Sequence, residues 1–306
     1  MSTWPHVPVL LRETIDALQP IDGGVYVDCT LGAGGHSEAL LSSANCRVIG
    51  FDRDESALEI ARARLAPFGD RFTGIHRSFG NLSESLDSAG VIAVDGVLAD
   101  LGVSSIQLDT PSRGFSFRAA GPVDMRMDTS AGHRASDLVN HWDEGQLAAC
   151  ISEYGEERFA RRVARAIVQG RPWSDTMVLA DAIARAIPAA SRNSGGSSRI
   201  HPATRTFQAL RIAVNDELGE LERLLPSALS RLRLGGRLAI ITFHSLEDRV
   251  VKRFIARESG RGTERDPFGH PVTEARLSDA QSITPAADDP NPRARSARLR
   301  AATRIR

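Results

Sequence analysis

The sequence predicts an α/β protein with a mostly parallel sheet, helices on both faces and an all-helical insertion. Strand-like and helix-like segments alternate over residues 24–100. Strand signals are then missing from about 105 to 205, and the alternation resumes after residue 206. Such alternation is typical of a parallel sheet, because each crossover helix returns the chain to the same end of the sheet.

The expected strands are short apolar runs, and the expected helices show a 3.6-residue apolar spacing. Strands are expected near 24–30, 47–52, 71–76, 91–99 and 235–243, with a last strand at the sheet edge over 297–305. Helices are expected near 55–65, 143–169 and 175–187, as one long helix over 207–225, and after an N-cap at Ser245. Loops are expected over 191–198 and 258–292, where glycine, serine, proline and polar residues gather.

The chain is therefore divided into three parts. Residues 1–105 form the first part of the α/β domain, 106–205 form the helical insertion, and 206–306 form the second part of the α/β domain. A length of 306 residues suits this arrangement, since it is enough for one large domain or two ordinary ones.

Composition excludes several classes of protein. The 38 basic and 38 acidic side chains balance, so net charge alone does not indicate a nucleic-acid partner. Three cysteines without CxxC spacing suggest neither zinc nor disulfides, which fits a reducing cytoplasm. The N-terminal residues do not form a signal peptide, and no apolar run approaches the ~20 residues of a membrane helix. We expect a cytoplasmic protein without a membrane segment.

The most informative segment is a glycine turn between a strand and a helix, Asp28-Cys-Thr-Leu-Gly32-Ala-Gly34-Gly35-His36-Ser37. Twenty residues after Gly32, a second strand ends at Asp52. Strand, glycine turn, helix, strand and acid together form a site for an adenosine-containing ligand, with the acid on the ribose hydroxyls. The alternative, a turn that serves only chain reversal, leaves the spacing of Asp52 unexplained.

The glycine spacing favours S-adenosylmethionine over a dinucleotide. A pyrophosphate binder needs a third glycine at position 37, where this chain has Ser37. Asp28, four residues before Gly32, is unfavourable beside pyrophosphate and suitable beside an ammonium group. S-adenosylmethionine carries an ammonium group and a sulfonium but no phosphate.

Further side chains are expected at the same edge of the sheet. Asp100 ends the fourth strand, so with Asp28 and Asp52 it would surround one crevice at the carboxyl ends of the strands. Phe79 would stack on or wall off the adenine, although an ordinary core phenylalanine explains it equally well. His201 and His244 flank the insertion and the fifth strand without a metal-ligand partner at suitable spacing, so no metal is expected.

Two groups of arginines are candidates for phosphate contacts. The first is a helical stripe, and the second lies in the run 291–306, which holds six arginines and no acid. The candidates are Arg158, Arg161, Arg162 and Arg165 in the stripe, and Arg293, Arg295 and Arg298 in the run. For the stripe, the alternative is a solvated helix face paired with neighbouring glutamates.

Nine sequence blocks, spread over nearly the whole chain, resemble those of one family. They are His6-Val-Pro-Val-Leu-Leu, Asp28-Cys-Thr-Leu-Gly-Ala-Gly-Gly-His-Ser, Asp100-Leu-Gly-Val-Ser-Ser, Arg113-Gly-Phe-Ser-Phe, Asp124-Met-Arg-Met-Asp, Tyr154-Gly-Glu-Glu-Arg, His201-Pro-Ala-Thr-Arg-Thr-Phe-Gln, Phe243-His-Ser-Leu-Glu-Asp-Arg and Asn291-Pro-Arg-Ala-Arg-Ser. In these blocks the chain resembles the bacterial 16S ribosomal RNA cytosine-N4 methyltransferases of the RsmH (MraW) type.

The resemblance implies a class I methyltransferase fold whose helical insertion recognises the substrate. It implies methylation, from S-adenosylmethionine, of a cytidine in the P-site region of 16S ribosomal RNA (cytidine 1402 in standard numbering) within the small subunit. The implied cofactor contacts are Gly34, Gly35, His36, Asp52, Phe79, Asp100 and Gln107, with Asp28 as a further candidate.

The segment after the fourth strand lacks a common motif of amino-methyltransferases. Many amino-methyltransferases place an N/D/S-P-P-Y/W tetrapeptide after the fourth strand, whereas this chain has Asp100-Leu-Gly-Val, as the resembling family does. The catalytic residue therefore cannot be read from that motif, and Asp100 is the candidate for positioning the target amine because it lies beside the expected methyl group. Two other functions stay open at this point: an NAD-dependent oxidoreductase, disfavoured by Ser37, and a non-catalytic RNA-binding factor, disfavoured by the three acids.

Overall fold

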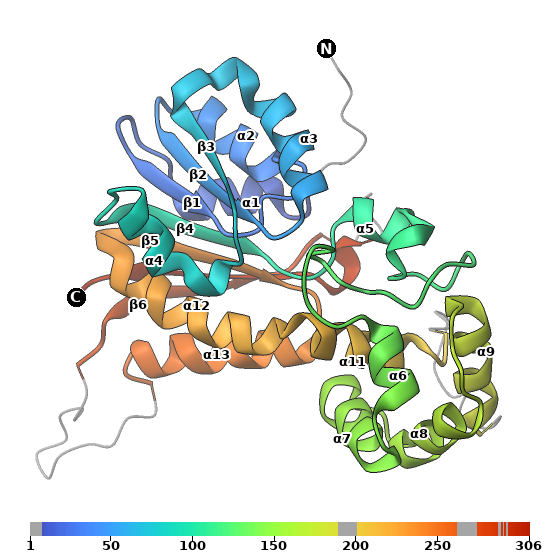
Figure 1. Ribbon diagram of the computed structural model, residues 1–306. Coiled ribbons are helices and arrows are strands. Elements are labelled where there is room, and N and C mark those ends of the chain that lie inside the picture. Colours follow the sequence, from blue (N-terminus) through green and yellow to red (C-terminus); the bar gives the residue numbers. More distant parts are fainter. Residues whose placement is uncertain (1–7, 189–200, 262–273, 287–288, 290, 292) are drawn as a thin grey trace, which may run out of the picture. The chain divides into compact units, whose positions relative to one another are not determined.

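The computed structural model describes residues 8–188, 201–261, 274–286, 289, 291 and 293–306. The loop expected over 191–198 lies outside the described residues. The chain forms two compact units (Figure 1). The sheet unit comprises Met1–Gly102 and Leu218–Arg306, and the helical unit comprises Val103–Glu217.

The sheet unit is built on seven strands in the order β3-β2-β1-β4-β5-β7-β6. The strands are β1 (Val25–Asp28), β2 (Arg47–Asp52), β3 (Phe72–His76), β4 (Val94–Asp100), β5 (Leu232–Thr242), β6 (Leu277–Ile283) and β7 (Arg298–Arg304). Strands β1 to β5 are parallel, whereas β7 runs antiparallel to both β5 and β6. The order reverses between β1 and β4, and ligands of open α/β sheets bind at such a switch point.

Helices cover both faces of this sheet (Figure 1). One face carries α1 (Leu11–Leu18), α2 (Gly35–Ser43) and α3 (Glu55–Leu65), and the other carries α4 (Leu82–Ser88), α12 (Glu217–Arg231) and α13 (Ser245–Glu258). Neighbouring strand residues alternate between the two cores: Val27 packs with α12 and α13, whereas Tyr26 packs with α1 to α3. Both faces are buried, which explains the continuous apolar strands in the sequence.

The helical unit follows β4 and precedes β5, as predicted. Its helices are α5 (Ser105–Asp109), α6 (Ala135–His141), α7 (Glu144–Gly155), α8 (Ala160–Gln169), α9 (Thr176–Ala186) and α11 (Thr204–Asn215). They enclose a core of their own, in which Met125, Leu147 and Ile183 are buried. Among the described residues of this unit there is no strand, only an isolated bridge between Pro122 and Asp175. None of the helices described is both long and apolar enough to cross a membrane.

Two predicted long helices were wrong, because each is interrupted after a left-handed residue. Residues 156–159 separate α7 from α8, beginning with Glu156 at φ 48°, and Asp216 alone separates α11 from α12 with φ 49°. A Cβ on Gly155 would lie 2.7 Å from the carbonyl oxygen of Arg205, so α7 ends where it packs against α11. The apolar spacing continues across each short break, and periodicity therefore does not reveal it.

The C-terminal segment also differs from prediction. The strand expected at the sheet edge over 297–305 is β7, which lies between β5 and β6. The loop expected over 258–292 was wrong at β6, whose sequence Leu-Ser-Asp-Ala-Gln-Ser-Ile is mostly polar, with Ile283 as its single β-branched residue and no aromatic residue. The N-cap of α13 is His244, and the predicted cap Ser245 is the first helical residue.

Candidate active site

Three aspartates meet at one end of the sheet, as the sequence predicted. Asp52, Asp28 and Asp100 end the adjacent strands β2, β1 and β4. Asp28 is level with Gly50 on one side and Leu98 on the other, so the two outer aspartates lie two residues further along their strands. The carboxylates thus surround the carboxyl end of β1, beside the glycine turn that follows it.

The glycine turn is held by Asp52. One carboxylate oxygen of Asp52 accepts a hydrogen bond from the Gly32 amide (2.8 Å), and the other accepts from the Asp54 amide (2.9 Å). Gly32 and Gly34 have φ of 51° and 78°, a region that favours glycine. A Cβ on Gly35 would lie 2.3 Å from Pro8 Cγ, so this position also has no room for a side chain. Burial raises the pKa of Asp52 to about 6.

Asp28 is buried under the same turn. Ser37 donates to its Oδ2 (2.8 Å), and the amide of Thr30 donates to its Oδ1 (3.2 Å). Burial raises the pKa of Asp28 to about 6, although both hydrogen bonds oppose this shift. Ser37, which replaces the third glycine of the dinucleotide pattern, is therefore a side-chain hydrogen-bond donor to Asp28. Sequence reasoning used Ser37 only to exclude NAD and missed this role.

Asp100 is the carboxylate with the fewest partners. Its Oδ1 is buried and has no hydrogen-bond partner among the residues that the structure describes, while its amide donates to Thr30 Oγ1 (2.5 Å). Oδ2 lies 3.8 Å from His36 Nδ1, whereas His36 Nε2 lies 3.2 Å from the Val9 carbonyl oxygen. Nε2 must donate to that carbonyl, so Nδ1 faces Asp100 without a proton. Burial lowers the pKa of His36 to about 4 and raises that of Asp100 well above its usual value, so the contact is not an ion pair.

Phe79 lies after β3 in a short 3-10 turn, η2 (Phe79–Asn81). Its ring is partly buried against the core, with the Arg53 guanidinium 5.7 Å from the ring centre. Glu220 of α12 holds this turn, because its carboxylate accepts from Ser78 and from the Gly80 amide (2.8 Å). The sequence contained no signal for Glu220, which is distant along the chain.

Gln107 belongs to the helical unit, where it is buried in α5. Its side-chain oxygen accepts from the Ser104 amide (3.1 Å), and Ser104 Oγ accepts from the Gln107 amide (3.2 Å). This reciprocal pair caps the helix. His201 also lies in the helical unit, where its ring packs 4.8 Å from that of Phe117.

The arginine stripe is not a single helix face, which corrects the prediction. Arg158 precedes α8 and lies over the ring of Phe159 at 4.5 Å. The other three are exposed on α8, where Arg165 pairs with Glu144 at 3.3 Å. Arg161 and Arg162 form no ion pair with any residue that the structure describes. The stripe was misjudged because the break after Gly155 is invisible in the spacing of the arginines.

The C-terminal arginines differ among themselves. Arg295 is exposed and Arg293 is half-buried, both near the short turn Ala294–Ser296. Arg298 on β7 contacts Ser282 (3.3 Å) and lies 3.8 Å from Asp248. Arg300, also on β7, pairs with Asp248 through two hydrogen bonds of 2.7 and 3.0 Å. Arg298 and Arg300 therefore have structural partners, and Arg295 is the most accessible of the predicted group.

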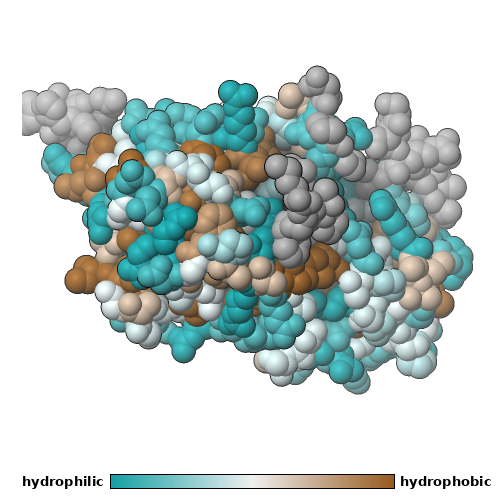
Figure 2. Space-filling model, turned by 90° about the horizontal axis from the view of Figure 1, so that it is seen from above, coloured by the Kyte–Doolittle hydropathy of each residue, from teal (hydrophilic) through white to brown (hydrophobic). Residues whose placement is uncertain are grey.

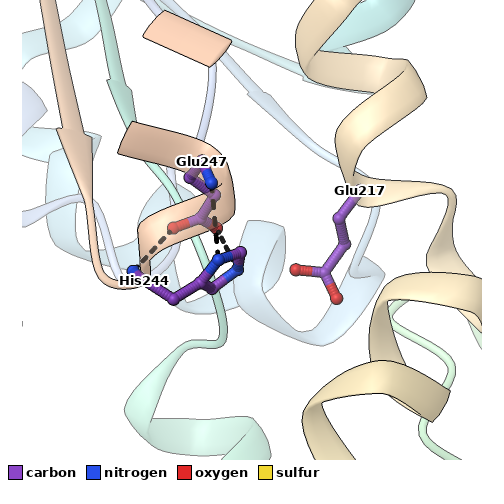
Figure 3. Close-up of side chains that lie close together, drawn as sticks. All are labelled: Glu217, His244 and Glu247. Atoms are coloured by element: carbon purple, nitrogen blue, oxygen red, sulfur yellow. Dashed lines mark hydrogen bonds and ion pairs between the residues drawn. The ribbon is translucent and has the colours of Figure 1, made fainter. Parts of the chain in front are cut away.

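His244 follows β5 and has acidic neighbours that the sequence analysis missed. His244 Nε2 lies 3.2 Å from Glu247 Oε1, and Glu217, the first residue of α12, lies nearby (Figure 3). One potential ligand atom from each residue falls within 4.8 Å of the others. However, Arg211 binds both oxygens of Glu217 (2.7 and 2.8 Å), and Glu247 accepts from the amides of Phe243 and His244. These hydrogen bonds account for the acidic groups without a cation.

The fold and this sheet edge define a class I S-adenosylmethionine-dependent methyltransferase: a seven-stranded sheet with an antiparallel β7, a glycine turn after β1, and an acid at the end of β2. The model of the MraW methylase family matches residues 3–305. The chain therefore belongs to the MraW methylase family.

Relatives named ribosomal RNA small subunit methyltransferase H are similar over nearly the whole chain. The protein of Carboxydothermus hydrogenoformans is 49% identical, covering 98% of both chains. That of Sorangium cellulosum is 51% identical, covering 98% of this chain and 91% of its own. A solved rRNA methylase from Streptococcus thermophilus aligns over 97% of this chain and 94% of its own, with 13% identity and a TM-score of 0.43. That structural likeness is distant, so the assignment rests on the family match.

Proposed function

We propose that this enzyme methylates the N4 amine of one cytidine in the P-site region of 16S ribosomal RNA, within the small subunit, in the cytoplasm. The names of its relatives support ribosomal RNA as the substrate. The observation that carries the chemistry is the buried Oδ1 of Asp100 at the end of β4, an acceptor to which no described residue donates a hydrogen bond. An exocyclic amine offers the N–H that this oxygen lacks.

The residues at this edge fit S-adenosylmethionine. Gly32, Gly34 and Gly35 carry no side chains between a ligand and the backbone of the turn, and Asp52 is placed to accept from ribose hydroxyls. Phe79 offers an aromatic face for the adenine. Cationic groups suit the three carboxylates, because a nearby positive charge lowers their raised pKa values and favours the ionised forms. The bound cofactor supplies an electrophilic methyl group. His36 and Gln107 complete the proposed set.

Asp100 is assigned the positioning of the amine. The lone pair of a cytosine amine is delocalised into the ring, so N4 is a weak nucleophile. A carboxylate that accepts one N–H fixes the orientation of the amine and favours the developing positive charge on nitrogen. No metal and no strong base are required, because the methylated amine loses its proton readily.

RNA contact is assigned to the arginine groups and to the helical insertion. On the face shown in Figure 2, hydrophilic and hydrophobic side chains are interspersed. Since the net charge is zero, local arginines must supply the attraction to phosphates. Arg161, Arg162 and Arg295 are exposed, and they are the strongest candidates among the seven named above. The target base must also leave its stack to reach the methyl group.

The proposal is tested by calorimetric titration with S-adenosylmethionine and NADH, followed by transfer of labelled methyl groups to 16S ribosomal RNA and to small subunits. We expect binding of the first ligand only, and labelling of at least one RNA substrate. Binding of NADH alone would favour an oxidoreductase. Failure to bind either ligand would favour a non-catalytic RNA-binding factor.

A further inference from the structure

The segments that follow β4 and β5 run side by side beyond the sheet. Asp100 is level with Ile241, and the amide of Leu101 donates to the Ile241 carbonyl (3.0 Å). Further on, a Cβ built on Gly102 would lie 3.5 Å from the ring of Phe243. His244 follows Phe243 directly. Its imidazole therefore stands at the end of the strand next to the one that presents Asp100.

The imidazole of His244 is held in one orientation and one tautomer. Its Nδ1 accepts from the Glu247 amide (3.4 Å), while the Glu247 carboxylate accepts from the amides of Phe243 (2.9 Å) and His244 (3.3 Å). Because Nδ1 is the acceptor, the neutral ring carries its proton on Nε2. Figure 3 shows this pair at the start of α13.

Within the described part of the chain, the Nε2 donor of His244 has no hydrogen-bond partner. It is buried, and its contact with Glu247 Oε1 at 3.2 Å lacks the direction of a hydrogen bond. Adjacent strand ends thus present two buried, unsatisfied polar atoms, the acceptor Oδ1 of Asp100 and the donor Nε2 of His244. Burying both without partners is unfavourable, so a ligand that satisfies both is expected.

We propose that His244 is a specificity-determining residue that donates to N3 of the target cytosine while Asp100 accepts from N4; this inference rests on the proposed function. Cytosine presents a donor at N4 beside an acceptor at N3, which matches the pair. Uracil presents an acceptor at position 4 beside an N3–H donor. The Asp100 acceptor would then face an acceptor, and the His244 donor would face a donor. Sites that hydrogen-bond a substrate in this way reject mismatched analogues strongly.

The test is a double-mutant cycle that combines one substitution in the protein with one change of the target base. His244→Asn keeps an N-cap for α13, because asparagine is a strong capping residue, but it removes the Nε2 donor. The RNA substrate carries either cytidine or 3-deazacytidine at the target position; the latter keeps the amine and replaces N3 with a C–H group. Ser245→Ala, exposed and adjacent, is the control.

We expect His244→Asn to lower kcat/KM about ten- to a hundredfold on the cytidine substrate, the scale of an unpaired buried hydrogen-bonding group. On 3-deazacytidine, where the parent is already slow, the same change should alter the rate less than about twofold. Cofactor affinity, Tm and the activity of the control should stay unchanged.

Two outcomes overturn the inference. An equal loss on both substrates would show that His244 acts through the protein structure and not through N3. An unchanged rate on cytidine would show that it does not contact the base. If the parent enzyme binds S-adenosylmethionine and methylates RNA at another atom, the proposed function fails first, and this result is distinct from either outcome.

Discussion

Buried carboxylates determine the residue-scale chemistry of this protein. Asp28 and Asp52 each accept two hydrogen bonds, yet burial still raises the pKa of both to about 6. Burial raises the pKa of Asp100 well above its usual value, and no described residue donates a hydrogen bond to its Oδ1. Ionising these three carboxyl groups is unfavourable when no ligand is bound. The cluster therefore favours a ligand that carries positive charge.

Cofactor affinity should therefore depend on pH. Because the pKa values of Asp28 and Asp52 are raised to about 6, both are largely protonated at pH 5 and must release protons to meet a cation. We expect the affinity for S-adenosylmethionine to fall by up to about tenfold between pH 7 and pH 5 for each proton released. His36, with a pKa of about 4, stays neutral over this range.

Calorimetry at pH 6 in two buffers of different ionisation enthalpy counts these protons directly. Asp52→Asn should reduce the number released, because one titrating group is removed. An affinity that is constant from pH 5 to pH 8, without proton release, would contradict the assignment of these carboxylates to the cofactor.

Ser37 should contribute to stability through its bond to Asp28. Ser37→Ala removes a fully buried donor and leaves the carboxylate with one partner fewer, so the free energy of unfolding should fall by ~1–3 kcal/mol. Ser43→Ala, at an exposed position on the same helix, is the matched control, with an effect within ~0.5 kcal/mol. Equal denaturation midpoints for the two variants would refute this role.

At the scale of elements, the sequence was informative where one strong local signal decides the structure. The strand, turn and helix around Gly32 were predicted closely because apolar alternation, glycine and strand length agree there. The breaks after α7 and α11 were missed because each begins at a left-handed residue, Glu156 or Asp216, whose conformation depends on tertiary packing. Strand β6 was missed because a polar edge strand is stabilised by its pairing with β7, which no local pattern records.

Gly35 tests the packing of the glycine turn. Gly35→Ala would place a Cβ 2.3 Å from Pro8 Cγ, so either the N-terminal segment or the turn must move. We expect a loss of ~1–3 kcal/mol in the free energy of unfolding, together with weaker cofactor binding. Gly145→Ala in α7, where the nearest atom would be Asp143 Oδ1 at 3.1 Å, should stay within ~0.5 kcal/mol. Unchanged stability and affinity in Gly35→Ala would show that the turn tolerates the extra atom.

The exposed arginines of α8 test the RNA assignment. Replacing Arg161 and Arg162 with glutamine should weaken RNA binding and lower the slope of log affinity against log salt by ~0.7–0.9 per lost phosphate contact. Arg12→Gln, which removes an exposed arginine on α1, is the control for net charge. If the double variant binds RNA with an unchanged salt slope, these arginines do not contact phosphates and belong to a solvated helix face.

At the scale of the whole molecule, one sheet edge combines contributions that are far apart in the sequence. The three acids and the glycine turn were predictable, since strand ends of a parallel sheet meet at one edge. The supporting residues were not, because Glu220 and Glu247 reach the site only through the pairing of β4 with β5 and the packing of α12 and α13. Their sequence neighbourhoods are ordinary helix starts and faces.

The central claim is that the methyl group is transferred to N4 of cytidine. The most direct measurement is digestion of enzyme-treated 16S ribosomal RNA to nucleosides, with chromatography and mass spectrometry against authentic standards. We predict N4-methylcytidine at one position, and its loss in Asp100→Asn even at saturating cofactor, because the amide presents no carboxylate to the amine. Formation of 5-methylcytidine, 3-methylcytidine or a ribose-methylated nucleoside in its place would contradict the account.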